Sequence, residues 1–197
     1  MNIIIGLTGP TGSGKSSAGA LAKDFGLKLA DCDKIARQAV QKDTDGLKAL
    51  LTAFGDDILN TDGTLNRKAL AKKAFSSREN TQLLNNTIFP YIRQLVLKET
   101  EQGNILMDAP TLFESGIDKI CFKTIAVLSN KKNRLARIIE RDNLTEEEAL
   151  LRMSAGKNDD FYLKNADYII YNNDSQEEFL KEFKEVLNKI LKSGESL

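Results

Sequence analysis

The fold of this chain is decided by the stretch Gly9-Pro10-Thr11-Gly12-Ser13-Gly14-Lys15-Ser16, which matches the pattern G-x-x-x-x-G-K-[ST] in full. A short apolar run, Ile3–Leu7, precedes it, and a helical pattern begins near Lys15. Glycines allow consecutive backbone N–H groups to turn inward and, together with the helix dipole, to surround a phosphate. We therefore predict a nucleotide-phosphate site formed by Gly9, Pro10, Thr11, Gly12, Ser13, Gly14, Lys15, Ser16 and Ser17.

Two side chains of this loop have predicted tasks of their own. Lys15 should reach the β- and γ-phosphates of ATP, and Ser16 should ligate Mg²⁺. The alternative is a glycine-rich turn that contains a lysine by chance. That alternative does not account for the strand before the loop and the helix after it.

Short apolar runs alternate with helical patterns along the rest of the chain. The runs are Ile3–Leu7, Leu27–Ala30, Ile105–Met107, Thr124–Leu128 and Tyr168–Tyr171. The helical patterns are Lys15–Phe25, Ile35–Val40, Gly46–Phe54, Asn66–Phe75, Glu79–Asn86, Pro90–Gln102, Lys131–Asp142, Thr145–Met153 and Gln176–Leu191. Runs this short and this apolar are typical of strands buried on both faces. The alternation predicts a three-layer α/β/α fold with a five-stranded parallel sheet.

The chain length favours one domain, residues 1–197, with inserted parts. We predict a core of about 1–40, 103–130 and 165–197. Residues 41–102 contain several helical patterns and no convincing strand, so we interpret them as a helical insertion that binds the acceptor. Residues 131–164 form a predicted lid. Within it, Thr145 and Glu148 match a capping box, which indicates a helix start.

Composition limits the possible partners. Lys plus Arg and Asp plus Glu each number 28, so no bulk field holds nucleic acid or an anionic membrane. Two cysteines, no CxxC pair and no histidine argue against a zinc site and exclude histidine catalysis. The N-terminus does not resemble a signal peptide, and no apolar run approaches the ~18 residues of a membrane span. We expect a cytoplasmic protein with a small-molecule substrate and no obligatory protein partner.

Aspartates follow two of the predicted strands, at the sheet edge where ligands gather in parallel α/β folds. Asp31 and Asp33 end the second strand, and Asp108 ends the third, where a carboxylate can hold Mg²⁺. An aspartate here can orient an acceptor hydroxyl and accept its proton. On an extended segment Asp31 and Asp33 point to opposite faces, so only one can face the γ-phosphate. Two alternatives stay open: Asp33 caps a helix that starts at Lys34, and Asp108 follows a short, common pattern.

Arginines gather on one predicted helix downstream. Arg134, Arg137 and Arg141 recur at spacings of three and four, which places them along one helix face, and Arg152 follows one helix later. Guanidinium groups can stabilise the charge of a metaphosphate-like transition state while a closing lid excludes water. The alternative is a solvated basic face with Glu140 as a neighbour. We interpret the helix as a candidate lid.

Several further motifs occur in a fixed order after the glycine-rich loop. They are Asp31-Cys32-Asp33-Lys34-Ile35-Ala36-Arg37, Phe54-Gly55, Asp62-Gly63-Thr64-Leu65-Asn66-Arg67, Ile88-Phe89-Pro90, Asp108-Ala109-Pro110-Thr111-Leu112-Phe113-Glu114, the arginine helix and Ala166-Asp167-Tyr168-Ile169-Ile170-Tyr171-Asn172. Together they resemble the dephospho-coenzyme A kinase family of P-loop kinases, nearly end to end. Motifs such as D-G-x-L-x-R and D-x-P-x-L-F-E are much more particular than the loop, which many kinases share.

The resemblance implies that ATP phosphorylates the ribose 3′-hydroxyl of dephospho-coenzyme A. In this reading Lys15, Asp33, Arg137 and Arg141 are catalytic, and Asn172 approaches the adenine of ATP. The implied metal ligands are Ser16 and Asp108. The implied substrate-binding residues are Asp31, Asp33, Arg67, Phe89, Pro90, Leu112, Phe113 and Glu114.

Three positions depart from the family pattern: Phe89 replaces the usual His, Thr111 the usual Leu, and Gly156 the usual Gln. All three lie on the acceptor or lid side, and Phe89 cannot donate the hydrogen bond of an imidazole. Three other readings stay open. One is a nucleoside, nucleotide or shikimate-type kinase, another a nucleotide-dependent switch, and the third a catalytically weakened relative.

Overall fold

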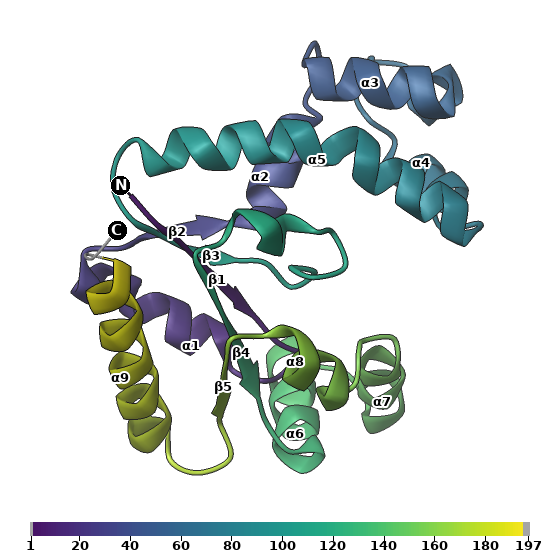
Figure 1. The fold of residues 1–197 in the computed structure, drawn as a ribbon. Coiled ribbons are helices and arrows are strands. Elements are labelled where there is room, and N and C mark those ends of the chain that lie inside the picture. The colour runs from purple at the N-terminus through teal and green to yellow at the C-terminus, as the bar shows by residue number, and fades with distance from the viewer. Residues whose placement is uncertain (1, 195–197) are drawn as a thin grey trace.

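Five parallel strands form the central sheet, in the order β2-β3-β1-β4-β5 (Figure 1). The strands are β1 (Ile4–Thr8), β2 (Lys28–Asp31), β3 (Ile105–Asp108), β4 (Lys123–Leu128) and β5 (Tyr168–Tyr171). The structure is a computed structural model and describes residues 2–194. Each predicted apolar run is a strand to within one residue at either end, so the predicted parallel sheet is confirmed.

Helices cover both faces of the sheet. They are α1 (Lys15–Ala20), α2 (Cys32–Ala39), α3 (Asp45–Phe54), α4 (Arg67–Ala74), α5 (Arg78–Thr100), α6 (Lys131–Asp142), α7 (Glu146–Ser154), α8 (Asp159–Asn165) and α9 (Gln176–Gly194), with short 3-10 helices η1 (Leu21–Phe25), η2 (Asp56–Ile58) and η3 (Ile117–Ile120). In Figure 1, α1 and α9 lie on one side of the sheet, and α2 and α5 lie on the other. The predicted three-layer architecture is confirmed.

Alternation along the strands divides the core into layers. On β1, Ile4 packs into the cluster shared with α2 and α5, whereas Ile5 and Leu7 pack into the cluster shared with α1 and α9. On β4, Ala126 and Leu128 pack against Tyr162 of α8. Because both faces are covered, β1 is buried throughout and β4 is buried from Thr124 to Leu128, and this is the pattern that made these strands predictable.

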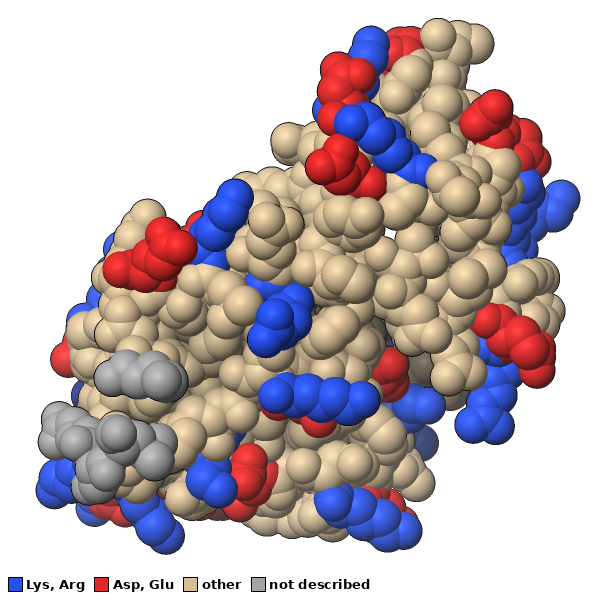
Figure 2. Space-filling model, turned by 45° about the horizontal axis from the view of Figure 1, so that its top comes forward, with Lys and Arg blue, Asp and Glu red and all other residues tan. Residues whose placement is uncertain are grey.

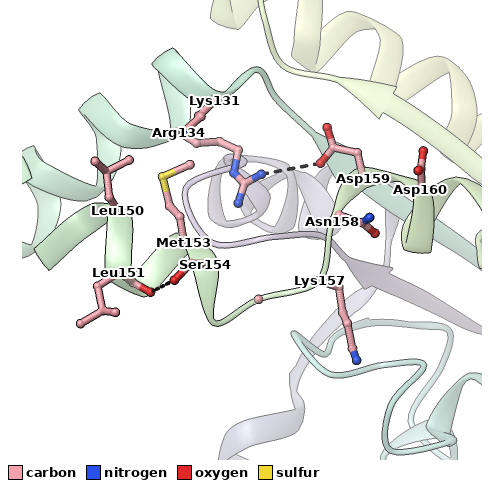
Figure 3. A pocket seen from close by; sticks show the side chains of 11 residues that line it. Lys131, Arg134, Leu150, Leu151, Met153, Ser154, Lys157, Asn158, Asp159 and Asp160 are labelled. Atoms are coloured by element: carbon pink, nitrogen blue, oxygen red, sulfur yellow. Dashed lines mark hydrogen bonds and ion pairs between the residues drawn. The ribbon is translucent and has the colours of Figure 1, made fainter. Parts of the chain in front are cut away.

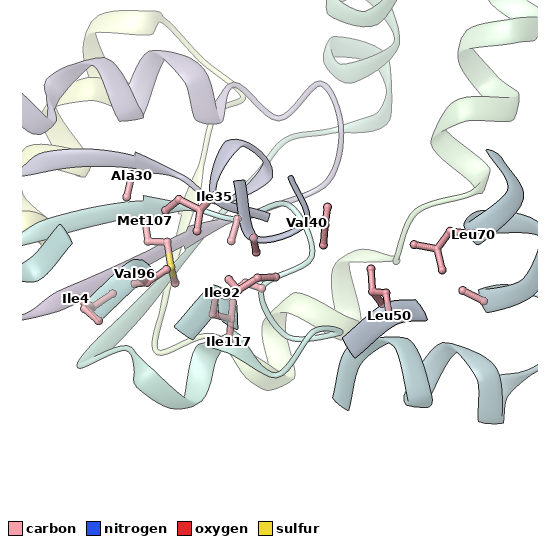
Figure 4. Packing of buried hydrophobic residues seen from close by; sticks show 14 of the residues in the cluster. Ile4, Ala30, Ile35, Val40, Leu50, Leu70, Ile92, Val96, Met107 and Ile117 are labelled. Atoms are coloured by element: carbon pink, nitrogen blue, oxygen red, sulfur yellow. The ribbon is translucent and has the colours of Figure 1, made fainter. Parts of the chain in front are cut away.

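The first cluster continues beyond the sheet into the helices above it. Figure 4 shows Ile4, Met107 and Val96 packed beside the sheet, with Leu50 and Leu70 farther along in α3 and α4. Helix α5 therefore links the sheet to α3 and α4, which project to one side in Figure 1. These apolar contacts make α3 and α4 an extension of the same core.

Three helix predictions need correction. The patterns Glu79–Asn86 and Pro90–Gln102 belong to one helix, α5, with Pro90 inside it. Proline lacks the N–H that would bond the carbonyl of Asn86, but Asn86 is exposed, so water can satisfy that carbonyl. Helix α8 was not predicted, because seven residues give too little periodicity. The predicted helix Lys15–Phe25 is α1 followed by the 3-10 helix η1.

Charges of both signs are interspersed on the face that Figure 2 shows, in agreement with the balanced composition. Among residues 2–194, no helix combines the length and apolar character that a membrane crossing requires.

Candidate nucleotide and acceptor site

Strand register places the predicted aspartates next to the glycine-rich loop. Asp31 at the end of β2 pairs with Asp108 at the end of β3, and Asp108 pairs with Leu7 of β1 on its other side. The loop begins at Gly9, just after β1 ends. The carboxyl edge of the sheet therefore brings together the loop and both strand-end carboxylates, as predicted from the parallel order.

A hollow of about 1020 Å³ opens over this edge. Among the predicted residues, its walls include the loop from Gly9 to Ser16, together with Asp33, Glu114, Arg137 and Arg141. A smaller pocket of about 70 Å³ adjoins it and is lined by Phe89. Asp33, Pro110 and Thr111 line both. Asp33 thus lies where the phosphate-loop side of the site meets the pocket on the side of α5.

The glycine-rich loop has the backbone shape that the motif predicts. Gly9, Gly12 and Gly14 have φ values of 141°, 78° and 100°, a region that L-residues with side chains rarely adopt. A side chain at Gly12 would also meet the Arg134 carbonyl at 2.7 Å. Helix α6 and the loop are therefore packed against each other with no space for a Cβ.

Two buried polar atoms in this region have no hydrogen-bond partner within residues 2–194: Ser13 Oγ and Asp108 Oδ1. Buried polar atoms are nearly always paired, so unpaired ones indicate a site that a ligand completes. Ser13 belongs to the glycine-rich loop, and Asp108 pairs with Leu7 just before that loop. This observation supports the fit of the site to a magnesium nucleotide.

The charged groups at the sheet edge affect one another. Burial lowers the pKa of Lys15 below its ordinary 10.5, while the neighbouring carboxylates of Asp108 and Asp33 oppose the shift. Burial raises the pKa of Asp108 above its ordinary 3.8, and Lys15 opposes that shift. Lys15 Nζ donates to the Gly9 carbonyl at 3.2 Å. The ammonium is therefore held by the backbone of the loop.

The metal prediction rests on few protein ligands. The described residues hold no group of three or more Asp, Glu, Cys or His side chains arranged for a metal ion. A phosphate-loop magnesium ion does not need one, because phosphate oxygens and water fill most of its coordination positions. Ser16, at the start of α1 and on the wall of the hollow, and Asp108 remain the predicted ligands.

The local structure around Asp33 differs from the prediction. Asp31, and not Asp33, caps α2: its Oδ1 accepts from the N–H of Lys34 at 3.0 Å. The helix therefore begins at Cys32, and Asp33 lies in its first turn, so the two aspartates do not share an extended segment. The alternative in which Asp33 caps a helix starting at Lys34 is wrong. Asp33 is exposed and free to face the hollow.

The arginines of α6 separate into two groups. Arg134 Nε donates to the Thr11 carbonyl at 3.0 Å, and Arg137 donates to the carbonyls of Gly12 and Ser13. Arg141 faces the hollow but pairs with Asp142, as does Arg152. The alternative of a solvated basic face is therefore wrong for the first half of α6, because Arg134 and Arg137 are bound to the loop.

A second hollow, of about 840 Å³, lies between α6, α7 and the start of α8. Figure 3 shows Arg134 reaching across it toward Asp159, an ion pair of 3.6 Å, with Met153 and Leu150 on the α7 side. The predicted capping box at the start of α7 is confirmed, with both Thr145 and Glu148 bonds formed. The hollow therefore separates α7 from the start of α8.

Several predicted site residues do not line either the main hollow or the small pocket. Leu112 is fully buried in the core, and Phe113 packs edge-on against Phe161. Arg67 and Pro90 are exposed on α4 and α5, and Ser17 is half-buried in α1. A direct contact of these residues with a substrate stays a prediction, as does that of Asp31.

Asn172 is 6% exposed and its Nδ2 donates to the Ser13 carbonyl at 2.8 Å. Its predicted contact with ATP stays a prediction. The sequence reasoning missed Ser129, which follows β4 and bonds both Arg137 and Asn172. Its place at the carboxyl end of a strand was the signal that could have found it.

The protein has a parallel sheet with a phosphate loop after β1, carboxylates on the adjacent strand ends and arginines facing the hollow. These features define it as a P-loop kinase. A family model described as "Dephospho-CoA kinase" matches residues 3–178. The chain belongs to the dephospho-CoA kinase family.

Individual relatives agree over nearly the whole chain. The dephospho-CoA kinase of Listeria monocytogenes serovar 1/2a is 35% identical over 199 residues, covering 98% of this chain and 100% of its own. A crystal structure from Thermus thermophilus, TT1252, has a TM-score of 0.76 at 31% identity and covers 95% of this chain and 97% of that one. Dephospho-CoA kinase from Campylobacter jejuni has a TM-score of 0.65 at 28% identity, covering 98% and 100%.

Proposed function

We propose that this protein transfers the γ-phosphoryl group of ATP to the ribose 3′-hydroxyl of dephospho-coenzyme A, giving coenzyme A and ADP. Membership of the family supports the acceptor. The observation that carries the chemistry is the place of Asp33, on the wall shared by the phosphate-loop hollow and the pocket beside α5. An acceptor hydroxyl at this boundary can face a γ-phosphate held by the loop.

ATP binds through its phosphates to the loop in this proposal. The inward N–H groups of the loop and the Lys15 ammonium neutralise the phosphate charge, and Ser13 Oγ gains a partner that it lacks within residues 2–194. Ser16 and Asp108 would hold Mg²⁺. A magnesium ion held there would offset the negative charge that develops on the phosphate oxygens during transfer.

Asp33 acts on the acceptor. Its carboxylate accepts a hydrogen bond from the 3′-hydroxyl, which aligns the oxygen with the γ-phosphorus. As the new O–P bond forms, the bond to the β-phosphate oxygen breaks, ADP leaves, and the hydroxyl proton passes to Asp33. Arg141, on the far wall, exchanges its contact with Asp142 for the oxygens of the moving phosphoryl group.

The acceptor lies along α5 and the segment after β3. Phe89 lines the small pocket and offers an apolar surface where the family pattern has an imidazole, so it supports binding by packing rather than by hydrogen bonding. Glu114 on the main hollow and Arg67 on α4 are the proposed polar contacts at longer range. The free thiols Cys32 and Cys121 agree with a reducing compartment, and we place the reaction in the cytoplasm.

The test uses dephospho-coenzyme A and its 3′-deoxyribose analogue, each with Mg²⁺ and ATP. The proposal predicts one added phosphate on the first compound and none on the second, measured by mass spectrometry. Phosphate transfer to the 3′-deoxy analogue at a similar rate would show that another hydroxyl is the acceptor. No transfer to either compound would refute the proposed function.

A further inference from the structure

Helix α6 contacts the outer side of the phosphate loop through two guanidinium groups. Arg134 Nε donates to the Thr11 carbonyl at 3.0 Å, and one Arg137 nitrogen donates to the Gly12 and Ser13 carbonyls at 3.3 and 3.4 Å. Three consecutive carbonyls of the loop are therefore held by α6. Arg134 is itself buried, so its hydrogen bond is sheltered from water.

The strand ends behind the loop complete the arrangement. Arg137 also donates to Ser129 Oγ at 3.1 Å, and its other terminal nitrogen donates to the backbone oxygen and to Oδ1 of Asn172, both at 3.1 Å. Ser129 Oγ donates to the Asn172 carbonyl at 2.7 Å. Asn172 Nδ2 then donates to the Ser13 carbonyl at 2.8 Å. The network joins the ends of β4 and β5 to the loop.

These bonds fix the direction of a peptide that faces the phosphate. In a trans peptide the C=O and the following N–H point in opposite directions. Asn172 and Arg137 hold the Ser13 carbonyl outward, so the N–H of Gly14 is turned toward the concave side of the loop. A Cβ at Gly14 would lie 2.1 Å from Asn172 Nδ2, which shows how closely the amide is packed behind this peptide.

We propose that Arg137, Ser129 and Asn172, with Arg134, form a carbonyl clasp that holds the phosphate loop in its binding conformation before the nucleotide arrives. Arg137 is then a positioning residue that acts through the loop, and its guanidinium does not move to the transferred phosphoryl group. Ser129 and Asn172, which line neither the main hollow nor the small pocket, determine nucleotide affinity through this contact. The proposal rests on the proposed nucleotide binding.

The clasp also divides the predicted lid. The first half of α6 is anchored to the loop, whereas Arg141 at its end and Arg152 in α7 pair with Asp142 of the same segment. The part that exchanges partners when the nucleotide binds is therefore the end of α6 together with α7. Arg141 is left as the arginine of α6 that reaches the reacting phosphate.

The experiment measures ADP affinity by titration calorimetry and steady-state kinetics for Ser129→Ala, Asn172→Ala, Arg137→Ala and Arg137→Lys. Removing a hydrogen bond to a charged group weakens binding by roughly tenfold or more. We expect about tenfold weaker ADP binding for Ser129→Ala and Asn172→Ala, and about a hundredfold for Arg137→Ala. Arg137→Lys should not restore affinity, because one ammonium cannot span these partners.

The controls are Arg78→Ala and Ser193→Ala, two exposed positions outside the network. Because the clasp acts before chemistry, the turnover of Ser129→Ala at saturating ATP and its KM for the acceptor should stay within about threefold of wild type. Adding Ser129→Ala to Arg137→Ala should cause little further loss of ADP affinity, since both remove the same unit. If the substitutions acted only by lowering stability, ADP affinity and turnover would fall together. The losses caused by the two substitutions would then add.

Two results would overturn the clasp while leaving the proposed function intact. One is wild-type ADP affinity in both Ser129→Ala and Asn172→Ala. The other is an Arg137→Ala enzyme with unchanged ADP affinity and greatly reduced turnover, which would place Arg137 on the transferred phosphoryl group. A wild-type protein that binds no ADP would refute the proposed function itself, and the clasp with it.

Discussion

Replacing Asp33 with asparagine separates acceptor chemistry from folding and from nucleotide binding. Asp33 is exposed in the first turn of α2, and the cap of that helix is Asp31, which the substitution leaves in place. Loss of a charge near a helix N-terminus costs about 1 kcal/mol or less. Loss of a general base slows transfer by about 10² to 10⁴, which corresponds to about 3 to 5 kcal/mol in the barrier. Turnover should therefore fall far more than stability.

The assay measures coenzyme A formation at saturating substrates, together with ADP affinity and the urea midpoint of unfolding. Asp24→Asn, an exposed carboxylate of η1 away from the hollow, is the matched control for loss of one negative charge. We expect Asp33→Asn to bind ADP normally and to unfold close to the wild-type midpoint, with turnover reduced at least a hundredfold. Turnover within threefold of wild type would refute the role of Asp33 as the base.

Three further predictions concern the loop, the acceptor pocket and the lid. Because burial lowers the pKa of Lys15, its positive charge is lost as the pH rises through a value below 10.5, and kcat/KM for ATP should fall in that range. A kcat/KM profile that stays flat up to pH 10.5 would contradict this prediction. Phe89→Ala removes apolar surface from the small pocket, so the KM for dephospho-coenzyme A should rise about tenfold while ADP affinity stays constant; an unchanged KM would remove Phe89 from the acceptor site. Thr145→Ala breaks the capping box of α7 and should lower the free energy of unfolding by about 1 kcal/mol in urea titrations; equal stability would show that the cap is not needed.

Local sequence was sufficient for the sheet and for the phosphate loop. The strands lie between covered faces, so Ile125 and Val127 are apolar like their neighbours, and the run stands out against amphipathic helices. The loop is recognisable because its glycines meet a backbone requirement that other residues do not. The strand-end aspartates followed from one rule about parallel sheets, and register places Asp31 beside Asp108 as that rule predicts.

Long-range side-chain contacts could not be predicted in the same way. The spacing of Arg137 and Arg141 shows that they share a face of α6, but not that Arg137 reaches a carbonyl 124 residues earlier. The continuity of α5 through Pro90 was missed because proline normally ends a helix, whereas here the helix runs through Pro90 with Asn86, four residues earlier, exposed to solvent. Which of Asp31 and Asp33 caps α2 depended on where the strand ends, a boundary that sequence places only approximately.

The most direct test of the proposed activity is an acceptor panel. Purified protein with Mg²⁺ and ATP is offered dephospho-coenzyme A, a set of nucleosides and nucleotides, and shikimate, and the mass of each acceptor is measured together with ADP release. We predict a gain of one phosphate on dephospho-coenzyme A alone, with ADP formed in equal amount. Phosphorylation of another acceptor in its place, or ADP release without any phosphorylated acceptor, would contradict it.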